Sequence, residues 1–136
     1  MISDWARERF AGAQVARLAT ADGFGRPHLV PIVFAVERAT IHSAVDAKPK
    51  SSTALRRLAN IADNPQVSLL VDHYDDDWTQ LWWARADGIA RVSVDAGAAI
   101  GLLAERYPQY REAPPAGPFI TIAVQHWSGW SASPLR

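Results

Sequence analysis

Hydrophobic and polar residues follow two periods along the chain, and the switches between these periods predict its elements. Two-residue alternation, or a short apolar run bounded by turn residues, is typical of a β-strand. Such segments predict six strands, at residues 14–20, 27–36, 40–45, 67–72, 81–94 and 119–131. Asp22-Gly23-Phe24-Gly25 separates the first two as a hairpin turn, because Asp-Gly tolerates positive φ. The second strand is mostly apolar, so we expect it to be buried on both faces.

Three segments show helical periodicity instead. Residues 3–11 predict a short helix that begins at Ser3 or Asp4. A second helix has apolar residues at i, i+3, i+4 and i+7, which are Leu55, Leu58, Ala59 and Ala62. Asn64-Pro65 ends this helix, since the residue before a proline disfavours helical angles. A third helix is expected at residues 95–107, capped by Asp95, with a loop at residues 108–118.

This order of elements predicts a mainly β protein with flanking helices. A hairpin start, six strands and short intervening helices favour a closed or partly closed antiparallel β-barrel. The strands are too unevenly spaced for a simple sandwich. The length of 136 residues predicts one domain over residues 1–136, long enough to bury a core without disulfides.

Composition narrows the possible functions. Fourteen basic residues balance fourteen acidic ones, which argues against nucleic-acid binding and against an anionic membrane as partner. The absence of cysteine excludes disulfides, thiolate catalysis and cysteine-ligated metals. The first ten residues are charged and lack an apolar signal core, and no apolar run reaches transmembrane length. We therefore expect a cytoplasmic protein without membrane insertion.

One segment concentrates positive charge around the start of the second helix. Cations, a hydroxyl and an amide converge there, and they are Lys48, Lys50, Ser51, Arg56, Arg57 and Asn60. A helix N-terminus offers unpaired N–H donors and a partial positive charge, which suit a phosphate-bearing ligand. The alternative is the ordinary solvated face of a surface helix. Neither a P-loop nor a G-x-G-x-x-G motif is present, so side chains and the helix end would hold the anion.

No catalytic machinery of the chain's own is evident. Asp75, Asp76 and Asp77 could hold a hard cation, but the glycine and glutamate of an EF-hand loop are missing, which favours a solvated loop. The four histidines show no metal-binding spacing, and no G-x-S-x-G elbow appears. A binding barrel of this kind can leave the chemistry to a bound cofactor.

Tryptophan is concentrated in the second half of the chain, which holds five of the six. The segment at residues 78–90 carries Trp83, Arg85 and Asp87 on one strand face, and Trp82, Ala84 and Ala86 on the other. Such a strand could simply cross from core to surface. Bulky aromatic rings on both faces favour a dimer interface.

Several short motifs occur in an order that resembles a known family. They are D-G-x-G-x-P (residues 22–27), H-L-V-P-I (28–32), K-P-K (48–50), N-P-x-V-S-L-L-V-D (64–72), D-x-W-x-x-L (76–81), D-G-I-A (87–90) and H-W-S-G-W (126–130). Together they resemble the flavin/deazaflavin oxidoreductases of the pyridoxamine-phosphate-oxidase-like split β-barrel, and in particular their small actinobacterial F420-binding branch. The resemblance covers nearly the whole chain and implies a six-stranded antiparallel split β-barrel.

The resemblance also implies a homodimer with cofactor sites at the subunit interface. The basic segment would grip the phosphate and acidic tail, with Lys48, Lys50, Arg57 and Asn60 as the best matches. The backbone around Val30, Pro31 and Ile32, and the next strand near Ser43, would flank the ring system. Trp78 would come from the other subunit, and His28 and Tyr74 are candidate proton donors.

Two cofactors fit this resemblance. FMN carries one terminal phosphate, whereas F420 adds an acidic oligoglutamate tail, and the number of cations in the basic segment favours F420. The implied activity is hydride transfer from reduced F420 to a small unsaturated organic acceptor. An FMN-dependent oxidoreductase and a non-catalytic F420 carrier remain the alternatives.

Overall fold

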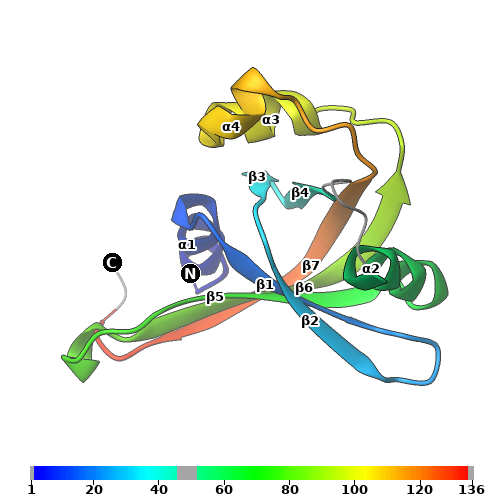
Figure 1. Ribbon diagram of the computed structural model, residues 1–136. Helices are drawn as coiled ribbons and strands as arrows, with labels where there is room; N and C mark the ends of the chain where they lie inside the picture. The colour runs from blue at the N-terminus through cyan, green and yellow to red at the C-terminus, as the bar shows by residue number, and fades with distance from the viewer. Residues whose placement is uncertain (1, 46–51, 135–136) are drawn as a thin grey trace.

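The computed structural model describes residues 2–45 and 52–134, the side chains of residues 52–55 excepted. In this part of the chain all strands form one antiparallel sheet with the order β2-β1-β5-β6-β7-β4-β3 (Figure 1). The strands are β1 (Ala16–Ala21), β2 (Pro27–Ile32), β3 (Ala35–Glu37), β4 (Thr40–Ala44), β5 (Gln66–His73), β6 (Trp82–Ser93) and β7 (Phe119–Ser131). The helices are α1 (Ile2–Gly12), α2 (Ser52–Asp63), the 3₁₀ helix η1 (Trp78–Gln80), α3 (Ala99–Arg106) and α4 (Pro108–Glu112).

The chain crosses from one end of this sheet to the other between β2 and β3. The two strands are neighbours in sequence, yet β2 pairs with β1 and β3 pairs with β4. The predicted strand at residues 27–36 is therefore split in two, so the sheet has seven strands where six were expected. The predicted fold class, a mainly β antiparallel split barrel with flanking helices, is confirmed.

Residues at the end of α3 hold this crossing in place. Arg106 donates a hydrogen bond of 2.6 Å to the carbonyl oxygen of Phe34 and another to the carbonyl oxygen of Ala13. The hydroxyl of Tyr107 lies 3.1 Å from the Phe34 amide nitrogen, which donates to it. β2 ends at Ile32, and the backbone groups of Phe34 then bond to these side chains instead of to a neighbouring strand.

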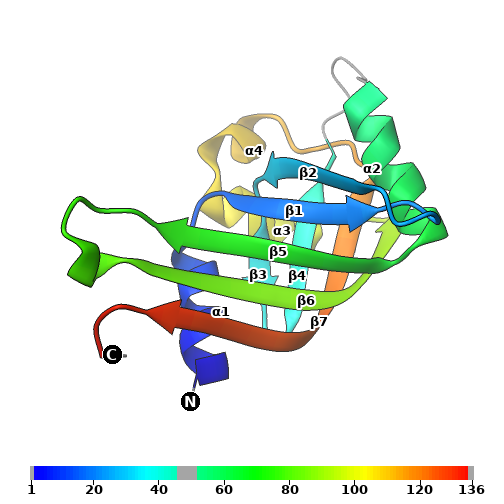
Figure 2. The same cartoon turned by 90° about the horizontal axis from the view of Figure 1, so that it is seen from below.

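The barrel interior is filled by large side chains set against small ones. Ala84, Ala86 and Ala90 of β6 line the inside, and the fully buried Phe10 of α1 reaches over them. The Phe10 ring meets the rings of Phe34 at 5.9 Å and Trp127 at 5.4 Å, both edge to face. α1 thus closes one end of the barrel (Figure 2).

A second apolar layer lies between the sheet and the α3–α4 pair. Leu103 and Tyr110 of these helices pack on Ala44 and Phe119 of the sheet. This layer corrects two predictions. The expected helix at residues 95–107 begins only at Ala99, because the Asp95 carboxylate accepts from the Gly97 amide, in a turn before the helix. Residues 108–118 are not all loop, since α4 begins at Pro108, a residue that suits the first helical turn.

Among the described helices, none combines the length and the apolar character needed to cross a lipid bilayer.

Gly88 allows β6 and β7 to approach each other at a β-bulge. A Cβ atom built at this position would lie 2.3 Å from the carbonyl oxygen of Ala123. Gly88→Ala should therefore lower the free energy of unfolding by about 2–3 kcal/mol, measured by urea denaturation. Gly101→Ala is the matched control, because nothing lies within 4 Å of the position inside α3. It should raise the free energy of unfolding by about 0.5–1 kcal/mol. Equal effects of the two substitutions would contradict the close approach at Gly88.

Candidate functional site

The two arginines of α2 lie in different environments. Arg56 is exposed, whereas Arg57 is half-buried where α2 packs against β1 and β6. The Nε atom of Arg57 is buried and has no hydrogen-bond acceptor among the described residues. Burial lowers the pKa of the Arg57 guanidinium. A desolvated cation without a counter-ion is costly, so this position is suited to receive an anion.

Asn60 belongs to the core side of the same helix. It is 5% exposed, and its Nδ2 atom donates to the Thr20 hydroxyl at 3.1 Å. This bond fastens α2 to β1. The sequence grouped Asn60 with the arginines as a ligand contact, which stays a prediction; in the structure its Nδ2 atom helps to hold the helix that carries them.

Three of the predicted contacts, Lys48, Lys50 and Ser51, lie outside the described residues. They belong to the connection between β4 and α2. Their role in binding a phosphate stays a prediction.

β2 carries the next group of predicted contacts. Val30 and Ile32 point into the core, and Pro31 between them is exposed. β2 pairs with β1 and, within the described part, with no strand on its other side. An edge strand offers unpaired backbone groups, which is consistent with the expectation that the β2 backbone flanks a ligand.

Ser43 of β4 is buried beside the chain crossing. Its hydroxyl donates to the carbonyl oxygen of Val33 at 2.8 Å. Ser43 therefore holds the segment after β2, and any contribution of its hydroxyl to a ligand would have to compete with that bond.

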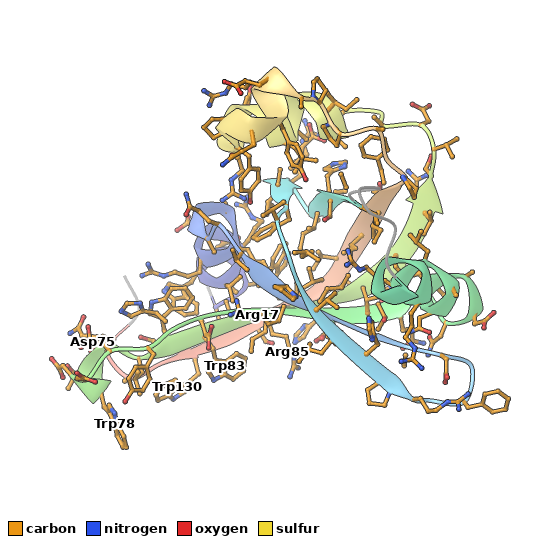
Figure 3. The ribbon with its side chains drawn as sticks, in the orientation of Figure 1. Arg17, Asp75, Trp78, Trp83, Arg85 and Trp130 are labelled. Atoms are coloured by element: carbon orange, nitrogen blue, oxygen red, sulfur yellow. The ribbon has the colours of Figure 1, made fainter. Side chains whose placement is uncertain are left out.

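Trp78 lies far from α2 within one chain. It begins η1 at the tip of the long β5–β6 hairpin, at the opposite end of the molecule from α2 (Figures 1 and 3). Its indole is 68% exposed and its Nε1 atom donates to the hydroxyl of Tyr74 at 3.4 Å. A single chain does not bring Trp78 to the arginines, so the two can share a site only if a second copy supplies one of them.

The outer face of β5, β6 and β7 forms an apolar hollow. Trp83 and Trp130 are register partners there, and Leu70 lies beside Arg85 in the next row. Figure 3 shows Trp83, Arg85 and Trp130 pointing away from the barrel interior. The hollow has a volume of about 410 Å³. The predicted alternation of β6 is confirmed, with Trp83, Arg85 and Asp87 outside and the small residues inside.

The sequence did not predict Leu70 and Trp130 as parts of this hollow. They come from β5 and β7, and only the strand register places them beside Trp83. The available signal was H-W-S-G-W at residues 126–130, which ends in a tryptophan on a predicted strand.

The aspartates at residues 75–77 shape the hairpin tip. The Asp77 carboxylate accepts from the Thr79 hydroxyl at 2.7 Å and from the Thr79 amide at 3.1 Å, and so caps η1. Donation from the Thr79 hydroxyl is the main cause that lowers the pKa of Asp77. No group of three or more acidic or histidine ligands lies together in the described part of the chain. The solvated-loop interpretation is consistent with this geometry.

The two candidate proton donors are not close to one another in sequence or in the sheet. His28 lies on β2 opposite Thr20, and its Nε2 atom is buried with no hydrogen-bond partner among the residues described. Tyr74 is 68% exposed near the hairpin tip. Only His28 lies on the same strand as the predicted ring contacts.

Comparison with protein families decides the affiliation of this fold. The family model described as pyridoxamine 5'-phosphate oxidase matches residues 2–131. The chain belongs to the pyridoxamine 5'-phosphate oxidase family. A comparison with curated proteins finds no match. The F420-binding branch suggested by the motifs is a finer statement than this match supports.

Solved structures agree with the family in fold. A conserved hypothetical protein from Mycobacterium tuberculosis is similar at 20% identity and a TM-score of 0.72, over 97% of this chain and 86% of that one. A FAD-binding protein from Mesorhizobium loti is similar at 21% identity and a TM-score of 0.70, over 95% of this chain and 94% of that one. A heme storage protein from Vibrio cholerae is similar at 17% identity and a TM-score of 0.67, over 96% of this chain and 91% of that one. At these identities the similarity shows the fold alone.

Replacing Arg57 by a neutral side chain of similar length tests the anion site. Arg57→Met should leave the free energy of unfolding within about 0.5 kcal/mol of the wild type, or raise it, because it removes a half-buried cation that has no counter-ion among the described residues. Millimolar inorganic pyrophosphate should raise the melting temperature of the wild type more than that of the variant. Thermal unfolding followed by circular dichroism measures both.

The exposed neighbour provides the control. Arg56→Met should keep most of the pyrophosphate response. If Arg57→Met instead lowered the free energy of unfolding by more than about 2 kcal/mol, Arg57 would already have a structural partner, and the proposal of an anion site at this position would be wrong.

Proposed function

We propose that this member of the pyridoxamine 5'-phosphate oxidase family is an F420-dependent oxidoreductase. It would transfer hydride from reduced F420 to a small unsaturated organic acceptor, at a site shared between two subunits of a homodimer. The observation that carries this proposal is the buried Nε atom of Arg57, which lacks an acceptor among the described residues on a helix that follows a basic segment. A phosphate or carboxylate group of the cofactor would supply that acceptor.

The number of cations near α2 supports F420 over FMN. Arg56 and Arg57 lie on consecutive positions of the helix, and Lys48 and Lys50 precede it in the sequence. One terminal phosphate does not require four cations. A phosphate followed by several carboxylates does, because each carboxylate can pair with a separate cation.

Bound F420 supplies the hydride chemistry, and the chain supplies binding and orientation. The arginines of α2 hold the acidic end, and Asn60 keeps the helix in position through its bond to Thr20. The edge of β2 would position the ring system through its backbone. The exposed Trp78 of the second subunit would cover the site and exclude water. His28, on β2 with an unpaired Nε2 atom, is placed to hold a proton near the ring.

The apolar hollow supports the dimer. Trp83, Trp130 and Leu70 form an exposed apolar surface of a kind that is common at subunit interfaces. Trp78, at the tip of the β5–β6 hairpin, points to the same side of the sheet as Trp83 and Trp130 (Figure 3). Contact between two such faces would let each hairpin tip reach beyond its own subunit, as the proposed site requires.

Titration of F420 fluorescence tests cofactor binding. The wild type should bind F420 in the low-micromolar range or tighter. The double variant Lys50→Ala/Arg57→Ala should bind at least tenfold more weakly, because two charge-assisted contacts are lost, each worth about 1.5–3 kcal/mol. Arg7→Ala on α1 is the control and should bind as the wild type does. Unchanged fluorescence of F420 on adding the wild type would refute the proposal, as would equal binding by the double variant.

Two alternatives predict different results. An FMN-dependent oxidoreductase should copurify with a yellow flavin and absorb near the flavin bands. A carrier should bind F420 without turnover. Stopped-flow measurement of reduced F420 oxidation by quinones, enones and tetrapyrroles separates the carrier from the enzyme, since a carrier does not make reduced F420 reduce any of them faster than it does free in solution.

Charge substitutions in the apolar hollow test the dimer. The wild type should have twice the chain mass of 14.9 kDa by light scattering. Leu70→Glu/Trp130→Glu should shift the measured mass toward that of a single chain, because each subunit would then have to bury two carboxylates in the interface. It should also weaken F420 binding, since Trp78 could no longer come from a second copy. Val94→Glu, at a position that is 89% exposed, should change neither. A double variant that remains dimeric would place the interface elsewhere.

A further inference from the structure

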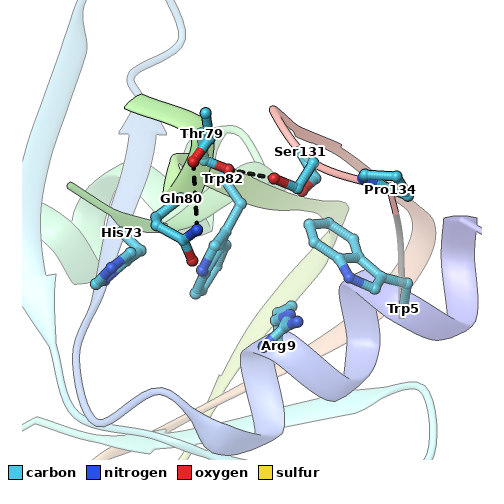
Figure 4. Close-up of a pocket in the computed structure, with 9 residues that line it drawn as sticks. Trp5, Arg9, His73, Thr79, Gln80, Trp82, Ser131 and Pro134 are labelled. Carbon is cyan, nitrogen blue, oxygen red and sulfur yellow. Dashed lines mark hydrogen bonds between the residues drawn. The ribbon is translucent and has the colours of Figure 1, made fainter. Parts of the chain in front are cut away.

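A separate cavity lies between α1 and the tip end of the long β5–β6 hairpin, at the end of the molecule opposite α2. Its volume is about 480 Å³, within the range of small-molecule sites. It is lined by Trp5, Arg9, His73, Thr79, Gln80, Trp82, Ser131, Ser133 and Pro134 (Figure 4). None of these residues belongs to the site proposed for F420.

Arg9 lines this cavity, and its guanidinium lies beside two indole rings. Its Cζ atom is 5.4 Å from the ring centroid of Trp5 and 5.3 Å from that of Trp82. Both distances fall in the range of cation–π interactions. Arg9 makes neither a hydrogen bond nor an ion pair with any described residue, so its N–H groups are unpaired within that part of the chain. The rings fix the position of the cation without neutralising it.

The lining has one sign of charge. Arg9 is cationic, and none of the described residues that line the cavity carries a carboxylate. Asp75 does not line the cavity, and its Oδ2 atom is 3.9 Å from Nε2 of His73. The remaining polar groups are hydroxyls and one amide. A cavity with these groups favours an anion, and a planar guanidinium matches a carboxylate through two parallel hydrogen bonds.

The walls are rigid and aromatic. Trp5 packs directly on Gly129 of β7, where a Cβ atom would lie 2.6 Å from the indole ring. The Trp5 and Trp82 rings meet edge to face at 6.0 Å, and His73 stacks on Trp82 at 6.2 Å. Figure 4 shows the space between Trp82 on one side and Trp5 and Ser131 on the other, with Arg9 below. The two indoles stand at 83° to each other and form two aromatic walls beside the cation, which suit a ligand with an aromatic ring.

We infer that this cavity is a binding site for a small planar aromatic carboxylate. The carboxylate pairs with the guanidinium of Arg9, and the ring of the ligand lies against the indole of Trp82. The site shares no residue with those proposed to contact F420, although His73 and Trp82 also line the outer hollow. It would be a second ligand site, which binds an organic acid at the end of the molecule opposite α2.

Indole N–H signals of the ¹⁵N-labelled wild type test this site directly. Titration with 1-naphthoate should shift the signals of Trp5 and Trp82 saturably, and leave those of Trp83 and Trp130 in place. The neutral analogue 1-naphthamide has the same ring and should bind at least tenfold more weakly, because it cannot form the ion pair with Arg9. This comparison needs no variant.

Substitution at Arg9 provides the second measurement. Arg9→Met should weaken 1-naphthoate binding at least tenfold, with the charge lost and the side-chain length kept. Arg7→Met, on the same helix but outside the lining, should bind as the wild type does. Equal shifts with naphthoate and naphthamide would overturn the inference, since Arg9 would then only cover the indole rings. Shifts confined to Trp83 and Trp130 would overturn it as well, because the ligand would occupy the outer hollow.

Discussion

The crossing of the chain at Phe34 is the constraint on which the rest of the structure depends. The fully buried Phe34 ring fills the barrel, and its backbone groups bond to the side chains of Arg106 and Tyr107. A seven-stranded sheet has two ends, and this crossing joins them through consecutive residues. Because the crossing ends β2 early, one edge of β2 remains without a strand in the described part of the chain. The same event that closes the barrel therefore exposes the backbone that the proposed cofactor site uses.

Sequence patterns predicted the strands well where alternation was strong and failed where closure decided the outcome. The small residues Ala84 and Ala86 of β6 pointed to the inner face correctly, because burial on one face imposes a period of two. The break of the second strand was not visible, since Val33 and Phe34 are apolar like the residues on either side. Arg106 and Tyr107, which cause the break, are about seventy residues away in sequence.

The candidate site stays a prediction, and the structure adds details of its residues that the sequence could not give. Charge clustering identified the segment that carries Arg57, but a helical pattern cannot tell that Nε is buried while Arg56 is exposed. Asn60 has the spacing of a ligand contact, and its hydrogen bond to Thr20 could not be read from that spacing. The sequence did not predict Arg9 as a site residue, because its contact with Trp82 depends on the fold, which brings β6 next to α1.

The two cations illustrate opposite ways of keeping a charge available. Arg57 is partly desolvated without a counter-ion in the described residues, which costs stability and strengthens the interaction with any anion that arrives. Arg9 is held by the faces of two aromatic rings, which retain it in place at little cost and leave its N–H edge unpaired. The first arrangement suits a cofactor that stays bound and completes the structure. The second suits a ligand that enters and leaves, since the site is formed before the ligand arrives.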